Sequence, residues 1–341
     1  MKRYRVLHLV GSASSEFYSQ LSQLYAKDCL EATTNPQLYD MQIALITPDR
    51  QWRFPTSLNP ADIAAAAPMP ISDAIRCIST QAIDVVLPQM FCIPGMTAYR
   101  ALLDVLQIPY VGNQPDVMAI ATHKARAKAI VAAAGVPVPQ GELLRRGDFP
   151  TIKPPAVVKP VNADNSFGVS FVADQTNYHV ALDGAFDHAE EVLVEEYIEL
   201  GREVRCGVIV KQGELIPLPL EEYFVDSQQH PIRNYSDKLK TTTTGELSLA
   251  AKDHDKAWIV ELDDPIVAVV QQAAKVCHQA LGCRHYSLFD FRISPQGQPY
   301  FLEAGLYCSF SPKSVIACMA KKAGLSLPDL LQLAINEALT N

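Results

Sequence analysis

The sequence predicts an α/β (α+β) protein with a parallel sheet in its first third and antiparallel hairpins further along. Short apolar runs alternate with helical patterns up to about residue 112, which is typical of βαβ units. Two later stretches, Glu203 to Leu218 and Tyr286 to Ala304, each hold two strand-like runs around a turn, which favours antiparallel hairpins. At 341 residues the chain has room for two or three domains.

The first third supplies the parallel sheet. The apolar run Val6 to Val10 follows a basic pentapeptide but is too short for a secretion signal, so it is expected to be the first buried strand. Gln51 to Pro70 contains four prolines and an alanine run and is expected to be a long excursion within the domain. The remaining expected elements here are strands at 5–10, 83–87 and 109–112 and helices at 16–32 and 98–106.

The rest of the chain mixes helices with hairpins. Met118 to Ala134 is expected to be one helix, because Gly135 stands where a C-terminal cap belongs and Val136-Pro137 stops it. The stretch 222–249 is long, polar and rich in threonine, which is typical of an active-site loop. The other expected elements are strands at 156–160 and 192–197, a hairpin turn at Gln212-Gly213, and helices at 265–281 and 327–339.

Composition excludes several classes of protein. Hydrophobic residues are 48% and charged residues 19% of the chain, so it is globular rather than disordered. The net charge is -8 and no basic stretch is interleaved with aromatics, which argues against a nucleic-acid partner. No apolar run approaches the ~20 residues that span a bilayer. The eight scattered cysteines lack metal-ligand spacing, so we expect reduced thiols and a cytoplasmic location.

The pair Asp290 and Glu303 is the most informative chemical feature. If the turn of the last hairpin centres on Gln296-Gly297, these two carboxylates lie directly opposite each other, ~5 Å apart on one face. Facing carboxylates repel unless they share a cation or a proton, and Mg²⁺ together with ATP phosphates suits that arrangement. The alternative is a pair of solvated acids on an edge hairpin.

Other charged residues stand at strand ends. Lys159 ends an apolar strand and requires an anion, for which the turn containing Ser166 is a candidate phosphate site. The alternative is a lysine that extends its ammonium group into water. Glu195-Glu196 ends another strand and Glu203 follows, so these acids could contact adenine and ribose, or could simply be solvated.

Taken in order, these residues resemble an ATP-grasp ligase of the D-alanine–D-alanine ligase group, over nearly the whole chain. The segments that carry the resemblance are Lys124, Val158-Lys159-Pro160, the loop with Ser166, Glu195 to Ile198, Asn234 to Lys238, Asp290 and Glu303. The resemblance implies three parts, at 1–115 (N-terminal βαβ domain), 116–200 (central ATP-grasp subdomain) and 201–341 (C-terminal subdomain with the metal site).

The resemblance also implies roles for individual residues. Lys238 and Ser166 would be catalytic, one reaching the γ-phosphate and the other in the loop that closes over the phosphates. ATP would be bound by Lys124, Lys159, Glu195, Glu196, Ile198, Glu203 and Leu302, and Mg²⁺ by Asp290 and Glu303. Ser314 and Lys313 would bind the attacking amino acid, and Glu16 is a further candidate substrate ligand.

The departures from the family pattern concern the first substrate. The family's arginine two residues before the metal aspartate is Leu288 here, and the asparagine two residues after the metal glutamate is Gly305. Its His-Gly pair corresponds to Met90-Phe91, and the phosphate-loop glycine corresponds to Asp164. In the predicted register Leu288 and Gly305 face each other, so one corner of the site has lost both polar groups.

These observations predict an ATP-dependent carbon–nitrogen ligase with a changed donor pocket. The chain looks most like the D-Ala–D-Ala-ligase homologue of mycosporine-like amino acid biosynthesis, which implies joining L-serine or L-threonine to mycosporine-glycine. The alternatives are a D-alanine–D-alanine or other dipeptide ligase and a non-catalytic ATP-binding regulator. Small-molecule substrates are expected, with no nucleic-acid or membrane partner, and a homodimer is compatible with the sequence.

Overall fold

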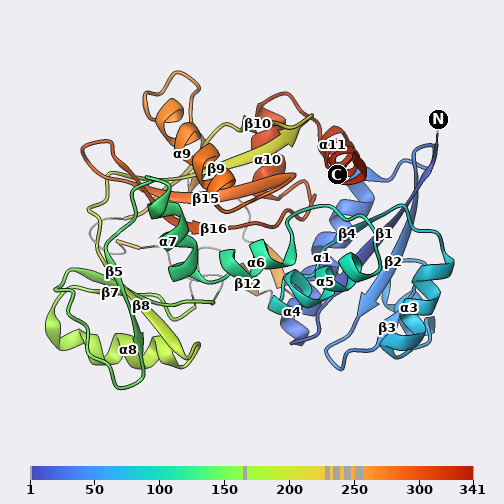
Figure 1. Cartoon of the computed structure of the whole chain (residues 1–341), viewed down its shortest axis with the longest axis horizontal. Helices are drawn as coiled ribbons and strands as arrows, with labels where there is room; N and C mark the ends of the chain where they lie inside the picture. The colour runs from blue at the N-terminus through green and yellow to red at the C-terminus, as the bar shows by residue number, and fades with distance from the viewer. Residues whose placement is uncertain are drawn as a thin grey trace.

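The computed structural model describes residues 2–163, 167–226, 231–232, 239–241, 247–249 and 256–340. Figure 1 shows an N-terminal part in blue and cyan, a smaller sheet in green, and a second sheet in yellow to red that lies between them. The mixed α/β architecture predicted from the sequence is therefore confirmed.

The N-terminal sheet has the strand order β3-β2-β1-β4. Its strands β1 (Tyr4–Gly11) and β4 (Val85–Pro88) run parallel, as predicted. A strand that the sequence analysis did not identify, β2 (Tyr39–Ile46), runs parallel to β1 on its other side, and β3 (Trp52–Arg53) adds an antiparallel edge. The expected strand near 110 forms a single parallel bridge, between Val86 and Tyr110. The helices of this part are α1 (Glu16–Thr33), α2 (Pro60–Ala65), α3 (Ile71–Thr80), α4 (Ile93–Met96) and α5 (Ala98–Val105).

The single helix predicted over 118–134 is wrong, because the structure has two helices there. They are α6 (Pro115–Ala121) and α7 (Lys124–Ala133). His123 between them has an extended backbone and caps α7, its ring nitrogen Nδ1 accepting from the backbone N–H of Arg126. An alanine-rich pattern does not reveal this interruption. The break between the two helices puts Lys124 in the first turn of α7. Gly135 follows the end of α7 at positive φ, as expected.

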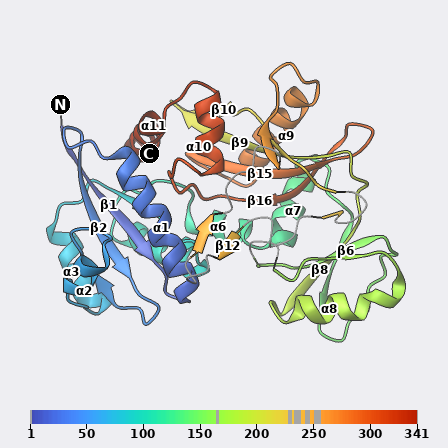
Figure 2. The ribbon, with the colours of Figure 1, turned by 180° about the vertical axis from the view of Figure 1, so that it is seen from behind.

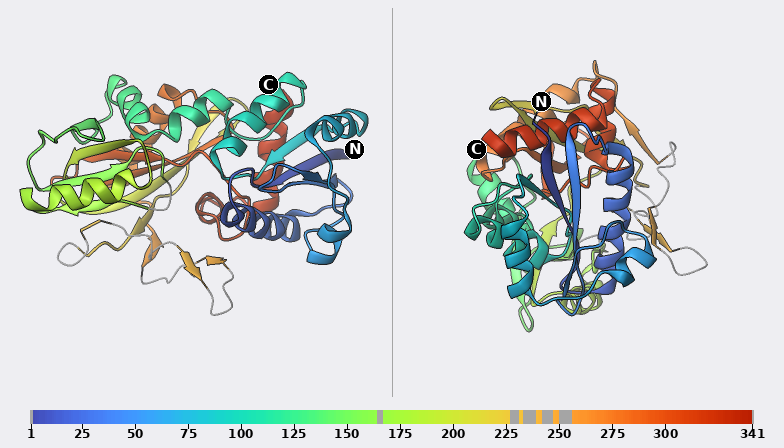
Figure 3. Two further views of the ribbon diagram at one scale, coloured as in Figure 1. Left: turned by 90° about the horizontal axis from the view of Figure 1, so that it is seen from below. Right: turned by 90° about the vertical axis from the view of Figure 1, so that its right-hand side faces the viewer.

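The central sheet is antiparallel with the order β5-β8-β6-β7, formed by β5 (Gly141–Arg145), β8 (Glu191–Glu196), β6 (Ala156–Pro160) and β7 (Ser170–Val172). The helix α8 (Tyr178–Phe186) packs on it after the 3-10 turn η1 (Gln175–Asn177) (Figure 3). Buried residues of α8 and of these strands form a hydrophobic core of their own. This sheet is thus a separately packed unit.

The C-terminal sheet has the order β14-β11-β9-β15-β16, with β10 paired to β9. The hairpin between β9 and β10 turns at Gln212 and Gly213, both at positive φ, as predicted. Helix α9 (Ile266–Ala280) packs against this sheet. The strands are β9 (Arg202–Lys211), β10 (Glu214–Pro217), β11 (Glu221–Tyr223), β14 (Ala257–Ile259), β15 (Tyr286–Ile293) and β16 (Pro299–Ala304), and a separate pair consists of β12 (Leu239–Thr241) and β13 (Leu247–Leu249).

The N-terminal and C-terminal sheets share a core. Buried residues from β1 and β4 pack in one cluster with residues from β9, β15, α10 (Val315–Lys322) and α11 (Leu327–Thr340). Figure 2 shows α11 next to α1 and β1, with α10 between α11 and the strands β9 and β15. The amide of Asn113 donates to the carbonyls of Tyr286 and Leu306, which adds buried polar contacts across it. These two parts are therefore joined by both apolar packing and buried hydrogen bonds.

Candidate functional site

A cavity that opens to solvent lies between the central and the C-terminal sheets. Its empty volume is about 830 Å³, including the solvent space at its mouth. One set of lining residues is apolar and could pack against a flat ring: Pro139, Val157, Val169, Ile198, Phe291 and Leu302. The other set is charged: Lys124, Lys159, Glu195, Glu196, Glu203, Asp290, Arg292 and Glu303.

Asp290 and Glu303 are directly paired across β15 and β16, as the hairpin argument predicts. The reason differs in one detail. Beyond the turn the register is Ile293 with Pro299 and Phe291 with Phe301, which would not bring the two acids together. A bulge between Asp290 and Phe291 shifts the register by one residue and aligns the carboxylates. Bulges of this kind re-aim side chains at functional sites.

The two carboxylates fit a magnesium site that is completed by phosphates. Within the described part of the chain, no three His, Cys, Asp or Glu side chains gather to enclose a metal ion. Mg²⁺ commonly uses one or two carboxylates together with substrate phosphates rather than an all-protein cage. The surrounding contacts are compatible with that role: the hydroxyl of Tyr223 donates to Asp290 Oδ2 over 3.2 Å, and Lys124 Nζ lies 3.8 Å from Glu303 Oε2.

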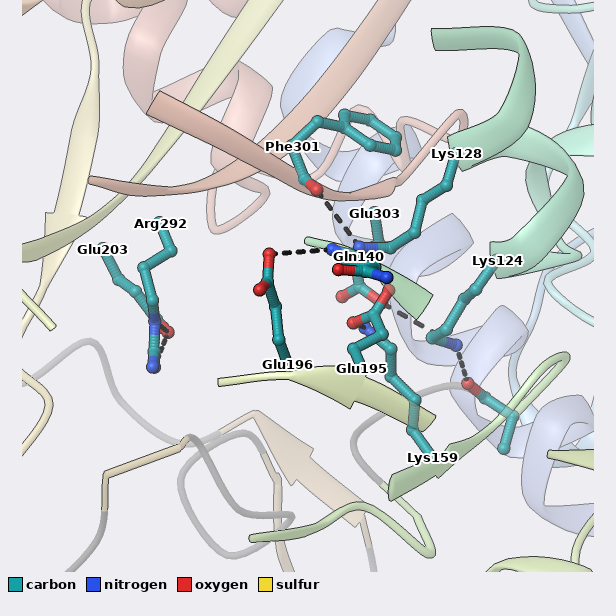
Figure 4. A network of polar contacts seen from close by, with 11 residues as sticks. Lys124, Lys128, Gln140, Lys159, Glu195, Glu196, Glu203, Arg292, Phe301 and Glu303 are labelled. Atoms are coloured by element: carbon teal, nitrogen blue, oxygen red, sulfur yellow. Dashed lines mark hydrogen bonds and ion pairs between the residues drawn. The ribbon is translucent and has the colours of Figure 1, made fainter. Parts of the chain in front are cut away.

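Glu195 lies between two buried lysines (Figure 4). Lys128 Nζ is 2.6 Å from Oε1 and Lys159 Nζ is 2.6 Å from Oε2. Burial works to raise the pKa of the Glu195 carboxyl, but the two ammonium groups hold it below its usual value. Burial lowers the pKa of Lys128 to about 7, even though Glu195 opposes the shift. The anion that Lys159 requires is therefore supplied, in this state, by Glu195.

Glu203 pairs with Arg292 on the neighbouring strand β15, Arg292 Nε donating to Oε1 over 2.9 Å. The same guanidinium donates to the carbonyls of Ile198 and Pro231, and it lies 5.0 Å from the ring centre of Tyr197. Arg292 thus ties the strand that carries Asp290 to the segment around Ile198, which forms one edge of the cavity.

The remaining predicted residues fall into three groups. In the first group, Glu196, Ile198 and Leu302 line the cavity. Glu196 also accepts a hydrogen bond from the backbone N–H of Gln140 over 2.9 Å. Ser166 and Lys238 lie outside the described residues. The third group, the predicted substrate ligands Ser314, Lys313 and Glu16, is away from the lining of this cavity.

Those three residues lie at helix starts. Ser314 caps α10, its hydroxyl accepting from the N–H of Ala317 over 3.3 Å. Lys313 Nζ is 3.8 Å from Asp28. Glu16 is exposed at the first residue of α1 and accepts from the amide of Gln20. Their assignment to substrate stays a prediction.

Sequence reasoning missed two cationic residues that the structure places at the site, and both had a local signal. Lys128 lies four residues after Lys124 on α7, which puts both on one helix face. Arg292 lies two residues after Asp290 in the same strand, which puts both on one sheet face. The periodicity of helix and strand would have found them once Lys124 and Asp290 were selected.

Comparison with known proteins gives a consistent family. A family model described as the D-ala D-ala ligase C-terminus matches residues 133–336. The D-alanine–D-alanine ligase B of Brucella suis is 32% identical over 254 residues, covering 71% of this chain and 76% of that protein. The D-alanine–D-alanine ligase of Trichlorobacter lovleyi is 33% identical over 249 residues, covering 70% of this chain and 73% of its own length.

Solved structures show the same fold. The VanG D-Ala:D-Ser ligase of Enterococcus faecalis superposes with a TM-score of 0.80 at 24% identity, covering 99% of this chain and all of that one. The D-alanine–D-alanine ligase of Bacillus anthracis, solved in complex with ATP, gives a TM-score of 0.71 at 21% identity, covering 99% and 98%. Among the described helices none is long and apolar enough to cross a membrane.

Proposed function

Because this chain belongs to the D-alanine–D-alanine ligase family of ATP-grasp ligases, which form ADP and phosphate, we propose that the cavity between its two antiparallel sheets binds ATP and drives formation of a carbon–nitrogen bond. The observation that carries the proposal is the facing pair Asp290 and Glu303 on one wall, with Lys124 and Lys159 entering the same cavity. Metal-binding acids and phosphate-binding cations are what phosphoryl transfer requires.

The proposed roles follow from the apolar and the charged residues that line the cavity. The apolar side, with Ile198 and Leu302, would pack against adenine. Lys124, at the start of α7, and Lys159, at the end of β6, would bind the phosphates, and Lys238 would reach the γ-phosphate. Glu196 and Glu203 would contact the base and ribose. Asp290 and Glu303 would hold Mg²⁺, which would neutralise the negative charge of the phosphates during transfer.

Glu195 has a different proposed role from the one its sequence position suggests. Its carboxylate is bonded to Lys128 and Lys159 and is almost fully buried, so it positions these lysines rather than standing free for adenine. With Lys128 and Lys159 fixed in this way, the phosphate-binding cation is preorganised and little rearrangement is needed when nucleotide binds.

The chemistry has two balanced steps. An oxygen of the first substrate attacks the γ-phosphorus, and the bond to ADP breaks with the electron pair leaving on ADP. The amino nitrogen of the second substrate then attacks the carbon that bears the phosphorylated oxygen. Phosphate leaves with that oxygen, and the nitrogen loses a proton. A carboxylate as first substrate gives an amide, and a conjugated ring carbonyl gives an imine.

The names of the relatives favour D-alanine as both substrates. Several D-alanine–D-alanine ligases are 31–33% identical to this chain over about 70% of its length, which makes a D-alanyl dipeptide the first product to test. In this version Ser314, as the cap of α10, would bind the carboxylate of the attacking amino acid.

A second candidate, mycosporine-glycine joined to L-serine or L-threonine, is favoured by one corner of the site. Gly305 donates its N–H to the carbonyl of Leu288 over 2.8 Å, so these residues face each other as predicted. Leu288 is 9% exposed and packs in an apolar cluster. Of Met90-Phe91, Met90 packs into the core of the N-terminal sheet, while Phe91 contacts the ring of Tyr307. Such a corner suits an uncharged ring better than a zwitterion.

An ADP-release assay tests the proposal and separates the candidates. The purified protein is incubated with MgATP and D-alanine alone, or with mycosporine-glycine plus L-serine or L-threonine, and the products are identified by mass spectrometry. D-alanyl-D-alanine formation supports the first candidate and an imine product the second. Binding of ATP without ligation of any pair would leave only an ATP-binding regulator.

A further inference from the structure

Four charged side chains form a row across four neighbouring strands of the C-terminal sheet. The strand pairings align Glu221 on β11 with Arg205 on β9, Arg205 with Asp290 on β15, and Asp290 with Glu303 on β16. Directly paired residues project from the same face of a sheet. The row therefore extends the two-carboxylate site sideways, by one arginine and one further acid.

Arg205 is held in place within this row. Its Nη2 atom is 2.9 Å from Glu221 Oε2, and its guanidinium carbon lies 4.8 Å from the ring centre of Tyr223. Its Nε atom is buried and has no hydrogen-bond partner among the described residues. Burial works to lower the pKa of the guanidinium, but Tyr223, Glu221, Asp290 and Tyr307 raise it above its ordinary value. Arg205 is thus a fixed cation with hydrogen-bonding capacity left over.

Arg205 stands on the far side of the metal-binding pair from the nucleotide. Asp290, Glu303 and Tyr223 line the ATP cavity, whereas Arg205 does not. Arg205 is close enough to Tyr25 on α1 to interact with it electrostatically. Burial raises the pKa of the Tyr25 hydroxyl to about 12, and the positive charge of Arg205 opposes that shift. Arg205 therefore lies where the C-terminal sheet meets the N-terminal part.

An aromatic cluster lies beside that position. The ring of Phe91, after β4, is 5.4 Å from the ring of Tyr25 and 5.4 Å from the ring of Tyr307, which follows β16. Tyr307 keeps 38% of its surface exposed and Tyr25 is partly exposed, whereas Phe91 is buried behind them at 4%, so Tyr307 and Tyr25 present the accessible rings of this cluster. Three segments far apart in sequence thus place flat rings next to one fixed cation.

We propose that Arg205 contacts the phosphoryl group in transfer and the substrate oxygen that receives it, with Tyr25, Phe91 and Tyr307 forming the wall against which that substrate lies. The substrate class is a molecule that carries an anionic or strongly polarised oxygen next to a planar, unsaturated or carboxyl carbon. This inference rests on the proposed function and adds the acceptor side of the same site.

Charge balance supports the placement. The three carboxylates and one guanidinium of the row leave two net negative charges, which a single Mg²⁺ neutralises. Negative charge that develops on the transferred group then meets a fixed cation, and charges that are already in position stabilise such a state without rearrangement. In the step itself the substrate oxygen bonds to phosphorus, the bond to ADP breaks, and Arg205 keeps all its protons.

The test uses aluminium fluoride with MgADP, a mimic of the phosphoryl group in transfer. Calorimetry measures the affinity of the full-length protein for MgADP with and without aluminium fluoride, for the wild type, Arg205→Met and Arg205→Lys. Arg202→Met is the matched control. Arg202 is on the same strand but projects from the opposite face, where it pairs with Glu222 and Asp264.

We expect aluminium fluoride to tighten MgADP binding by at least ~10-fold in the wild type and in Arg202→Met, since mimics of transition states bind more tightly than ground-state ligands. Arg205→Met should lose most of this gain and Arg205→Lys part of it, while MgADP alone binds within about two-fold of normal. Full retention of the gain in Arg205→Met, equal weakening of MgADP alone, or no gain in the wild type would each overturn the proposal.

A kinetic readout covers the substrate side. With the substrate pair that gives product in the ADP-release assay, Arg205→Lys should lower kcat and raise KM for the phosphorylated substrate, leaving KM for ATP near normal. Failure of the proposed function shows differently, as absence of ligated product in the wild type with every pair. Normal kinetics of Arg205→Lys and Arg205→Met in an enzyme that does ligate would refute the role of Arg205 alone.

Discussion

Replacing Glu195 with glutamine tests the electrostatic centre of the site. The substitution keeps the shape of the side chain and removes the charge that pairs with Lys128 and Lys159, each 2.6 Å away. All three residues are at most 7% exposed, so water cannot take over the pairing. Removing one partner of a buried ion pair costs about 3–5 kcal/mol, because the remaining charge is buried without compensation.

The expected loss can be measured by thermal unfolding. Unfolding entropy of about 2 cal/mol/K per residue gives roughly 0.7 kcal/mol/K for a cooperative unit of this length, so a loss of ~4 kcal/mol lowers Tm by about 6 °C. The adjacent Glu196→Gln is the control. Glu196 is half-buried and accepts one hydrogen bond from the N–H of Gln140, which the oxygen of glutamine can also accept, so this substitution should cost at most about 1 kcal/mol, or 1–2 °C.

Equal Tm values for the two variants would refute the role of Glu195 as the buried partner of the two lysines, because a paired, buried carboxylate should then matter more than the half-exposed Glu196. A normal Tm in Glu195→Gln would likewise show that Lys128 and Lys159 do not depend on Glu195 for compensation. MgATP added to Glu195→Gln should recover part of the loss, because its phosphates supply negative charge to the same lysines.

Five further substitutions have definite expected outcomes. Asp290→Asn should reduce turnover at least ~100-fold at ordinary magnesium concentration, and a near-normal rate would contradict the metal site. Lys159→Met should weaken ATP binding, as measured by calorimetry, whereas Lys238→Met should mainly lower turnover. Unchanged ATP affinity and unchanged turnover in both variants would disprove the phosphate assignments. Ser314→Ala should raise KM for the attacking amino acid far more than for the other substrate. Burial lowers the pKa of His8 to about 4, below its unfolded value near 6.5. The folded protein therefore loses stability as the pH falls from 6.5 towards 4, by about 3 kcal/mol from this residue. In His8→Gln, the free energy of unfolding in urea should lack this part of the pH dependence.

The sequence carries the local parts of the fold well. Turn chemistry at Gln212-Gly213 and around Gln296-Gly297 located both hairpins, because positive φ is concentrated in few residue types. The break between α6 and α7 was missed, since both flanking stretches favour helix and the cap depends on the conformation of His123. The bulge next to Asp290 was also missed, although the pairing that it produces was predicted.

The site was predictable only in part for a different reason. Asp290 and Glu303 belong to one hairpin, so their pairing follows from a short stretch of sequence. Arg205 joins them through the pairing of β9 with β15, strands more than 80 residues apart, and tertiary packing decides which strands become neighbours. Contacts of that kind leave no periodic trace in a single sequence.

The most direct test of the central claim is the stoichiometry of ADP release. The purified protein, MgATP and one substrate pair are followed in parallel for ADP by a coupled assay and for ligated product by mass spectrometry. We expect one ADP for each new carbon–nitrogen bond, dependence of ADP release on the amino acid, and loss of both signals in Asp290→Asn. ADP release that continues without a ligated product, or product formed at the normal rate by Asp290→Asn, would contradict this expectation.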